Sequence, residues 1–199
     1  VGVDKGETYD YRFCFIVQVE GESQGESDAE NVVLSAEGDN IYDAVAVVEV
    51  GVPYQLNFGR ANYMLFSKEV AETGYIARFI DESFKNLGVR RSTKLMVVLG
   101  DSLDYCTGVV SKDNPNTSKR QYSILRDYVS EGLTPITNIA MFTQNVNAKR
   151  GDNIVTLGAT DDSIPNEEIT GSSQDSELNP NSTTAGVERT GGLRAYYMG

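Results

Sequence analysis

The chain of 199 residues contains no histidine and no tryptophan. Histidine is the usual base of serine hydrolases and a common ligand of zinc and other transition metals. Its absence argues against a Ser-His-Asp hydrolase and against most transition-metal sites. Only two cysteines are present, Cys14 and Cys106, and they form no C-x-x-C pair. We therefore expect two free thiols, with a single Cys14–Cys106 disulfide as the alternative.

Basic residues are also scarce. The 17 Lys and Arg face 29 Asp and Glu, and the net charge is −12. Such a chain repels a phosphate backbone, and no basic stripe with interleaved aromatic residues offsets this, so no nucleic-acid partner is predicted. Long apolar runs are missing too: the stretch Ala44 to Val52 is interrupted by Glu49 and is too short to cross a bilayer. Any export signal or lipid anchor would precede Val1.

Strand and helix patterns alternate through the first half of the chain. Residues 11–20 place apolar side chains at every second position, which predicts a strand, and a turn through Asp4-Lys5-Gly6 before it makes a hairpin plausible. Three further strands are expected over 31–38, 61–67 and 93–100. A helix over 40–50 is expected to be capped by Asp39, and a short helix over 68–74 by Ser67. A third helix over 75–88 is expected to bury Ile76, Phe79 and Ile80. This order predicts an α/β (mixed α+β) fold, a single layered domain with helices packed on a mixed β-sheet.

The apolar run from Leu95 to Leu99 is followed by Gly100-Asp101-Ser102-Leu103, which is how the nucleophile segment of a GDSL-type esterase reads. Without a histidine to accept its proton, a serine hydroxyl is a weak nucleophile. We therefore predict that the strand ends in a Gly-Asp turn and that Ser102 caps the next helix. Two enzyme alternatives remain open: a hydrolase fragment whose histidine lies beyond Gly199, and acid–base chemistry by Asp101 and Asp104.

Neither a cofactor nor a metal site is predicted. No Gly-rich phosphate loop opens any expected helix. Residues Gly151 to Val187 hold no Lys or Arg and are rich in Ser, Asn, Thr, Asp and Glu, which predicts a long polar loop. Its carboxylate pairs, Asp161-Asp162 and Glu167-Glu168, lack the spacing of an EF-hand, so solvated charge is favoured over a calcium site.

Two regions follow from this organisation. Residues 1–150 are expected to form an α/β domain with one more helix after residue 116. Residues 151–199 are expected to hold the polar acidic loop and a terminal strand, which belong to the same domain or begin the next one.

The segment from Asn31 to Gly100 resembles the N-terminal domain of the spore germination receptor C-subunit family, the Ger(x)C lipoproteins. Gly38 precedes a helix with Ile41 and Ala44 at the family's apolar positions. A turn over 56–59 then leads into an apolar strand, and a Ser-initiated helix over 67–74 follows it. The opening "VGVDKG" resembles the segment that follows the family's lipid-bearing cysteine, while Arg60 stands where the family has a histidine.

The resemblance implies a non-enzymatic subunit of a nutrient germinant receptor. It implies no cofactor, a lipid anchor upstream of this sequence at the extracytoplasmic side of the inner spore membrane, and integral-membrane receptor subunits as partners. Near the family's turn, four residues are candidates for a partner or ligand surface: Tyr54, Asn57, Arg60 and Tyr63. The alternative is an extracytoplasmic small-ligand-binding domain in which these side chains line a pocket. For Arg60 we expect a surface salt bridge rather than a ligand contact.

Overall fold

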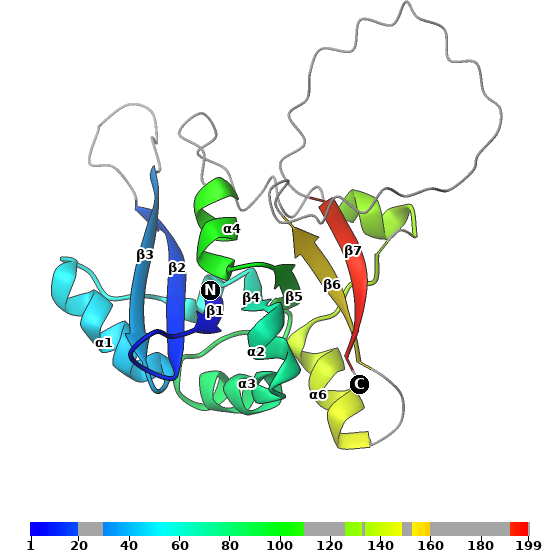
Figure 1. Ribbon diagram of the computed structural model, residues 1–199, viewed down its shortest axis with the longest axis horizontal. Coiled ribbons are helices and arrows are strands. Elements are labelled where there is room, and N and C mark those ends of the chain that lie inside the picture. Colours follow the sequence, from blue (N-terminus) through cyan, green and yellow to red (C-terminus); the bar gives the residue numbers. More distant parts are fainter. Residues whose placement is uncertain (20–29, 110–125, 133, 149–152, 160–191, 199) are drawn as a thin grey trace, which may run out of the picture.

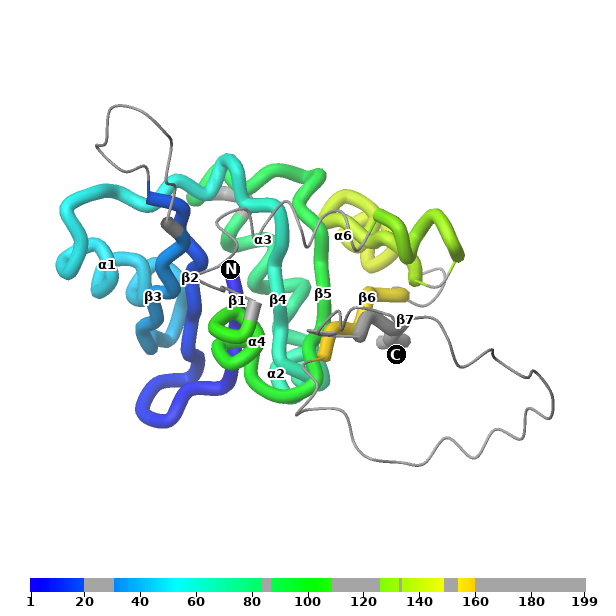
Figure 2. Tube along the Cα trace, turned by 90° about the horizontal axis from the view of Figure 1, so that it is seen from above, coloured from blue at the N-terminus to red at the C-terminus, as the bar shows by residue number. Residues whose placement is uncertain are grey.

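The computed structural model describes residues 1–19, 30–109, 126–132, 134–148, 153–159 and 192–198. These residues form a seven-stranded mixed sheet in the order β3-β2-β1-β4-β5-β6-β7. Figure 2 shows β3 to β6 of this order side by side. The strands are β1 (Gly2–Lys5), β2 (Tyr11–Val19), β3 (Glu30–Gly38), β4 (Tyr63–Ser67), β5 (Lys94–Leu99), β6 (Asn153–Ala159) and β7 (Gly192–Met198). Strands β1, β4, β5 and β6 pair in parallel, and antiparallel strands flank them on both sides.

Helices cover both faces of this sheet, which confirms the expected mixed α/β architecture. They are α1 (Ile41–Gly51), α2 (Lys68–Glu72), α3 (Tyr75–Asn86), α4 (Ser102–Val109) and α6 (Ile139–Ala148), with a 3-10 turn η1 (Phe58–Arg60). In Figure 1, α4 lies above β1 and β4, while α2 and α3 lie below them. Buried side chains of α1, α2, α3 and α6 share one core cluster, and those of α4 belong to a second cluster.

Local signals explain most helix boundaries. The Ser67 hydroxyl accepts the Val70 N–H at 3.4 Å, which confirms the expected cap of α2. Gly74 adopts φ +74° between α2 and α3, a conformation that a side chain disfavours. The expected Asp39 cap of α1 is wrong: Asn40 Oδ1 accepts the N–H groups of Tyr42 and Asp43, at 2.9 and 3.1 Å. Asp39 lies one residue too early to reach them, and its carboxylate is 3.5 Å from the N–H of Asp10.

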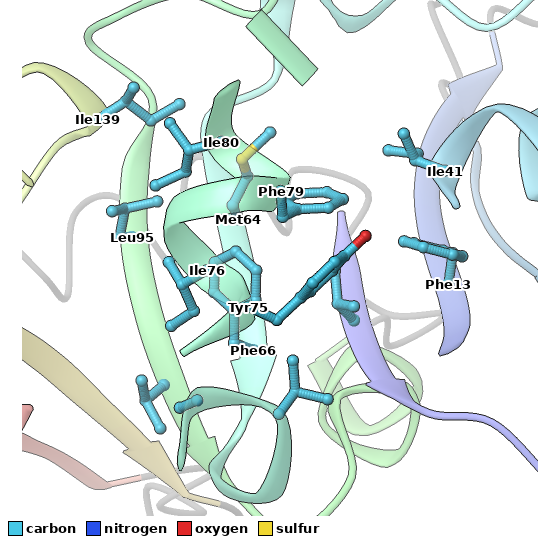
Figure 3. Packing of buried hydrophobic residues seen from close by; sticks show 14 of the residues in the cluster. Phe13, Ile41, Met64, Phe66, Tyr75, Ile76, Phe79, Ile80, Leu95 and Ile139 are labelled. Atoms are coloured by element: carbon cyan, nitrogen blue, oxygen red, sulfur yellow. The ribbon is translucent and has the colours of Figure 1, made fainter. Parts of the chain in front are cut away.

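The core follows the alternation of strand side chains. Met64 and Phe66 of β4 face the cluster with α3, while Leu65 between them faces α4. Phe79 of α3 is fully buried and meets Phe66 edge-on with ring centroids 5.4 Å apart. Figure 3 shows both rings among the other side chains of this cluster. A buried ring of this kind stabilises the fold by about 1.5–3 kcal/mol, so the expected apolar face of α3 is a main anchor of the helical layer.

One expectation fails in the second half of the chain. The polar loop predicted from Gly151 to Val187 is wrong for Asn153–Ala159, because these residues form β6 between β5 and β7. The short apolar run Ile154, Val155, Leu157 is sufficient for a buried strand, and Val155 is only 1% exposed. The rest of that loop, its carboxylate pairs and residues 110–125 of the expected helix lie outside the described residues.

At the two ends of the chain the expected strands are present. The predicted hairpin joins β1 to β2, although β1 continues through Asp4 and Lys5, so its turn begins at Gly6 rather than at Asp4. The strand expected at the C-terminus is β7.

Candidate functional site

Ser102, the residue that raised the hydrolase alternative, is enclosed in the core. Its side chain is fully buried, and its Oγ lies 3.5 Å from the thiol sulfur of Cys14. The expected capping role is wrong, because Ser102 is the first residue of α4 and its own N–H needs an acceptor. That acceptor is Asp4 of β1. A hydroxyl packed in this way is not presented to a substrate.

Asp4 connects α4 to the sheet. Its two carboxylate oxygens accept the N–H of Ser102 at 2.6 Å and the N–H of Leu103 at 3.1 Å. The guanidinium of Arg12 lies 3.8 Å from Asp4 and also bonds the exposed Asp101 at 2.9 Å. Burial raises the pKa of Asp4 above its ordinary value, and the two backbone hydrogen bonds offset only part of this rise. Both oxygens of Asp4 are thus committed to the first turn of α4, which indicates a structural role rather than a reactive one.

The candidate loop before β4 is held at both ends and exposes its polar residues. Glu49 of α1 accepts the Leu56 N–H at 2.8 Å, and Asn57 Oδ1 accepts the Gly59 N–H at 2.9 Å. Phe58 is buried in the core cluster, whereas Asn57 and Arg60 on either side of it are exposed. The loop therefore presents these two side chains from a fixed backbone.

The salt bridge expected for Arg60 is not found in the described part of the chain. None of the ion pairs between described residues includes this guanidinium. An exposed guanidinium keeps its donors available for a partner.

The other two candidates differ from these in their surroundings. Tyr54 is half-buried in the segment that follows α1. Tyr63 begins β4 and packs with the cluster on the α4 face, and the Lys94 ammonium lies 5.6 Å from the centre of its ring. Phe58 belongs to the cluster on the other face. The structure thus brings Asn57 and Arg60 into one turn, while Tyr63 has a packing role.

Two valines that the sequence analysis did not single out are exposed on α1, the helix that precedes this loop in the chain. On α1, Val47 is 60% and Val50 is 90% exposed. They are three positions apart, so they share one side of the helix. Their exposure could have been predicted from the run "AVAVVEVGV", because this run has more apolar residues than a helix with a single buried stripe can cover. We name the exposed valines together with Tyr54, Asn57 and Arg60 the α1–η1 surface.

Among the described residues, no group of three or more Cys, Asp and Glu side chains is arranged to hold a metal ion. Within those residues, no helix combines the length and the apolar character that crossing a membrane requires.

Comparison with known proteins gives one family match. The model of the family described as "Spore germination protein N-terminal domain" matches residues 1–158, which is most of the chain. No curated protein sequence matches at a significant level.

One solved structure is similar in part. It is the crystal structure of the GerBC protein, with 11% identity and a TM-score of 0.37. The match covers 81% of this chain and 44% of that chain, so the present sequence spans less than half of that protein's length.

Proposed function

Because the chain belongs to the spore germination protein N-terminal domain family, we propose that it is a non-enzymatic subunit of a nutrient germinant receptor. The family match over residues 1–158 carries the proposal, and it supports a role in spore germination. In this proposal the protein acts by protein–protein contact with the integral-membrane subunits of the receptor. A lipid attached upstream of Val1 holds it at the inner spore membrane, as the resemblance of Asn31–Gly100 implies.

The α1–η1 surface is the proposed contact site. Adjacent exposed apolar side chains are typical of protein-binding sites, and Val47 and Val50 provide them. Aromatic and Arg side chains often anchor interfaces, and Tyr54 and Arg60 are available in the same segment. Since hydrogen bonds to Glu49 and Asn57 already fix the loop, little conformational entropy is lost when it binds.

The test compares capture of the neighbouring membrane subunits by the complete, lipid-anchored protein and its variants. Val50→Ser, Tyr54→Ala and Arg60→Ala are each expected to weaken capture by about tenfold or more, since an interface anchor contributes above 1 kcal/mol. Controls of the same residue types are Val146→Ser on α6 and Arg90→Ala before β5, which change exposed side chains elsewhere. Capture equal to that of the parent by all three surface variants would overturn the proposed surface.

Thermal melts separate a loss of contact from a loss of fold. Ile41→Ala and Phe79→Ala remove fully buried side chains and are expected to cost roughly 2–5 kcal/mol. The surface variants are expected to melt close to the parent. If Tyr54→Ala melts as low as these core variants, Tyr54 is a structural residue and leaves the contact surface.

A further inference from the structure

The two cysteines of the chain meet in the core on the α4 face. Cys14 lies on β2 and Cys106 on α4, 92 positions later, and their sulfur atoms are 3.3 Å apart. Both side chains are fully buried and both are free thiols. We propose that Cys14 and Cys106 are a disulfide-forming pair whose oxidation ties α4 covalently to β2.

Neighbouring groups hold the two sulfurs together. Cys14 is fixed in register opposite Gly2 on one side and Ser35 on the other. At Gly2 an added Cβ would lie 2.3 Å from the Cys14 sulfur and 2.4 Å from Ser102 Oγ, so only glycine leaves room for the thiol. Asp4 fixes the first turn of α4 through two backbone hydrogen bonds. Strand β1 thus positions both partners of the pair, Cys14 through Gly2 and the helix of Cys106 through Asp4.

The remaining approach is short. A disulfide bond is about 2.05 Å long, so the sulfurs must move roughly 1 Å closer than they are in the reduced protein. We expect rotation of the two side chains about their Cα–Cβ bonds to supply this displacement. No other thiol exists in the chain to compete for either partner.

Cys14 is the better nucleophile of the two. The thiolate is the reactive form of cysteine. The contact with Cys106 lowers the pKa of Cys14, and the same contact together with burial raises the pKa of Cys106. Cys14 therefore ionises first and carries the first step of exchange.

The oxidant in this proposal is a low-molecular-weight disulfide, R–S–S–R. The Cys14 thiolate attacks one of its sulfurs, the R–S–S–R bond breaks, and one RS⁻ leaves. Cys106 then loses its proton and attacks the Cys14 sulfur, and the second RS⁻ leaves. The two released thiolates take up the two protons that the cysteines lost. One disulfide is thus reduced to two thiols as the two cysteines are oxidised.

Access to the pair requires α4 to open. The helix has eight residues, and Thr107 and Gly108 at its C-terminal end are exposed. Because both thiols are fully buried, the rate of oxidation should follow the frequency with which α4 separates from the sheet.

The experiment uses the full 199-residue chain, first reduced and then incubated with oxidised glutathione. We expect a monomer in which non-reducing peptide mapping joins the Cys14 and Cys106 peptides, with no thiol left to titrate in denaturant. The melting temperature is expected to rise by about 5–15 °C, because the crosslink closes a long loop of the unfolded chain. Dithiothreitol should restore the original value.

Cys106→Ser is the control, and it should gain neither the crosslink nor the higher melting temperature. If Cys106→Ser does not fold, the parent protein serves as its own control, because reductant should reverse the rise in its melting temperature. Two unreacted thiols after prolonged incubation would overturn the proposal, and so would disulfides found only to glutathione or between chains. Neither cysteine lies on the α1–η1 surface, so this result is independent of receptor binding.

Discussion

Glu37 of β3 fixes the turn that joins β1 to β2. Its carboxylate accepts the N–H of Glu7 at 3.0 Å, of Thr8 at 2.9 Å and of Tyr9 at 3.3 Å. These hydrogen bonds, the one from Glu7 first, hold the pKa of Glu37 below its ordinary value of 4.5. The folded protein therefore favours the charged form of this side chain more than the unfolded chain does.

A pH-dependent stability difference follows from this. Since the folded pKa is depressed, the stabilisation by Glu37 is fully present above the unfolded pKa near 4.5 and is lost as pH falls through the lower folded pKa. We expect the stability gap between the parent and Glu37→Gln to stay constant above about pH 6 and to shrink in more acidic solution. Urea unfolding over a pH series measures it, with Glu131→Gln as the control for an exposed carboxylate. A gap that does not change with pH would contradict the role of Glu37.

A residue that accepts backbone N–H groups can be predicted from the sequence only when those groups lie a few positions away along the chain. Ser67 was predictable as a cap because its partner Val70 is three positions away. Asp4 was not, because the N–H groups it accepts lie 98 and 99 positions later. Ser102 was predicted as the N-cap of α4 because it is a polar residue at the start of the helix. The true acceptor became visible only when β1 and α4 were brought together.

At the scale of elements, α4 depends on one strand for both its N-terminus and its packing. Asp4 of β1 accepts its first two N–H groups, and Gly2 of the same strand leaves space for Ser102. Tyr105 and Cys106 then bury the inner side of the helix. Removing the acceptor should therefore loosen the whole element.

We expect Asp4→Ala to lower the free energy of unfolding by about 1.5–3 kcal/mol, because buried N–H groups lose a charged acceptor. Amide exchange should quicken in α4 more than in α3, which rests on the other face. Asp101→Ala is the matched control, since the exposed Asp101–Arg12 pair is worth at most about 1 kcal/mol. Equal effects of the two substitutions in urea unfolding would show that Asp4 is not the anchor of α4.

The elements that sequence reasoning misjudged share one cause. β6 was assigned to a loop because the acidic residues around it dominated the composition of the window. The outer side of α1 was passed over because a one-sided apolar stripe was assumed, whereas Val47 and Val50 are exposed. α3 was predicted correctly because its stripe is strong and its other side is polar. Short segments such as β6 and uniformly apolar segments such as α1 show no such contrast between an apolar and a polar side, so their exposed and buried residues are hard to predict.

For the molecule as a whole, the strand order separates two regions. α1 packs on β3, which is one edge of the sheet (Figure 1), so the two valines of the α1–η1 surface belong to a helix at that edge. β6 and β7 complete the opposite edge. Changes at the C-terminal strands should consequently affect stability without changing the side chains proposed for receptor contact.

A chain that ends at residue 150 tests how far the C-terminal strands belong to the fold. It would lack β6, so the backbone groups of β5 from Met96 to Leu99 would lose their partners, and Val155 and Leu157 would leave the core. We expect this shortened chain to melt at least 10 °C below the 199-residue chain, roughly the effect of losing several kcal/mol, and to associate through the newly exposed edge. Thermal melts and light scattering measure both effects.

A full-length Val155→Ala variant loses part of one buried side chain but keeps the strand. Its melting temperature should lie between those of the shortened chain and the 199-residue chain. Identical melting of the shortened and full-length chains would mean that residues 1–150 fold independently and that β6 only adds to a sheet that is already stable.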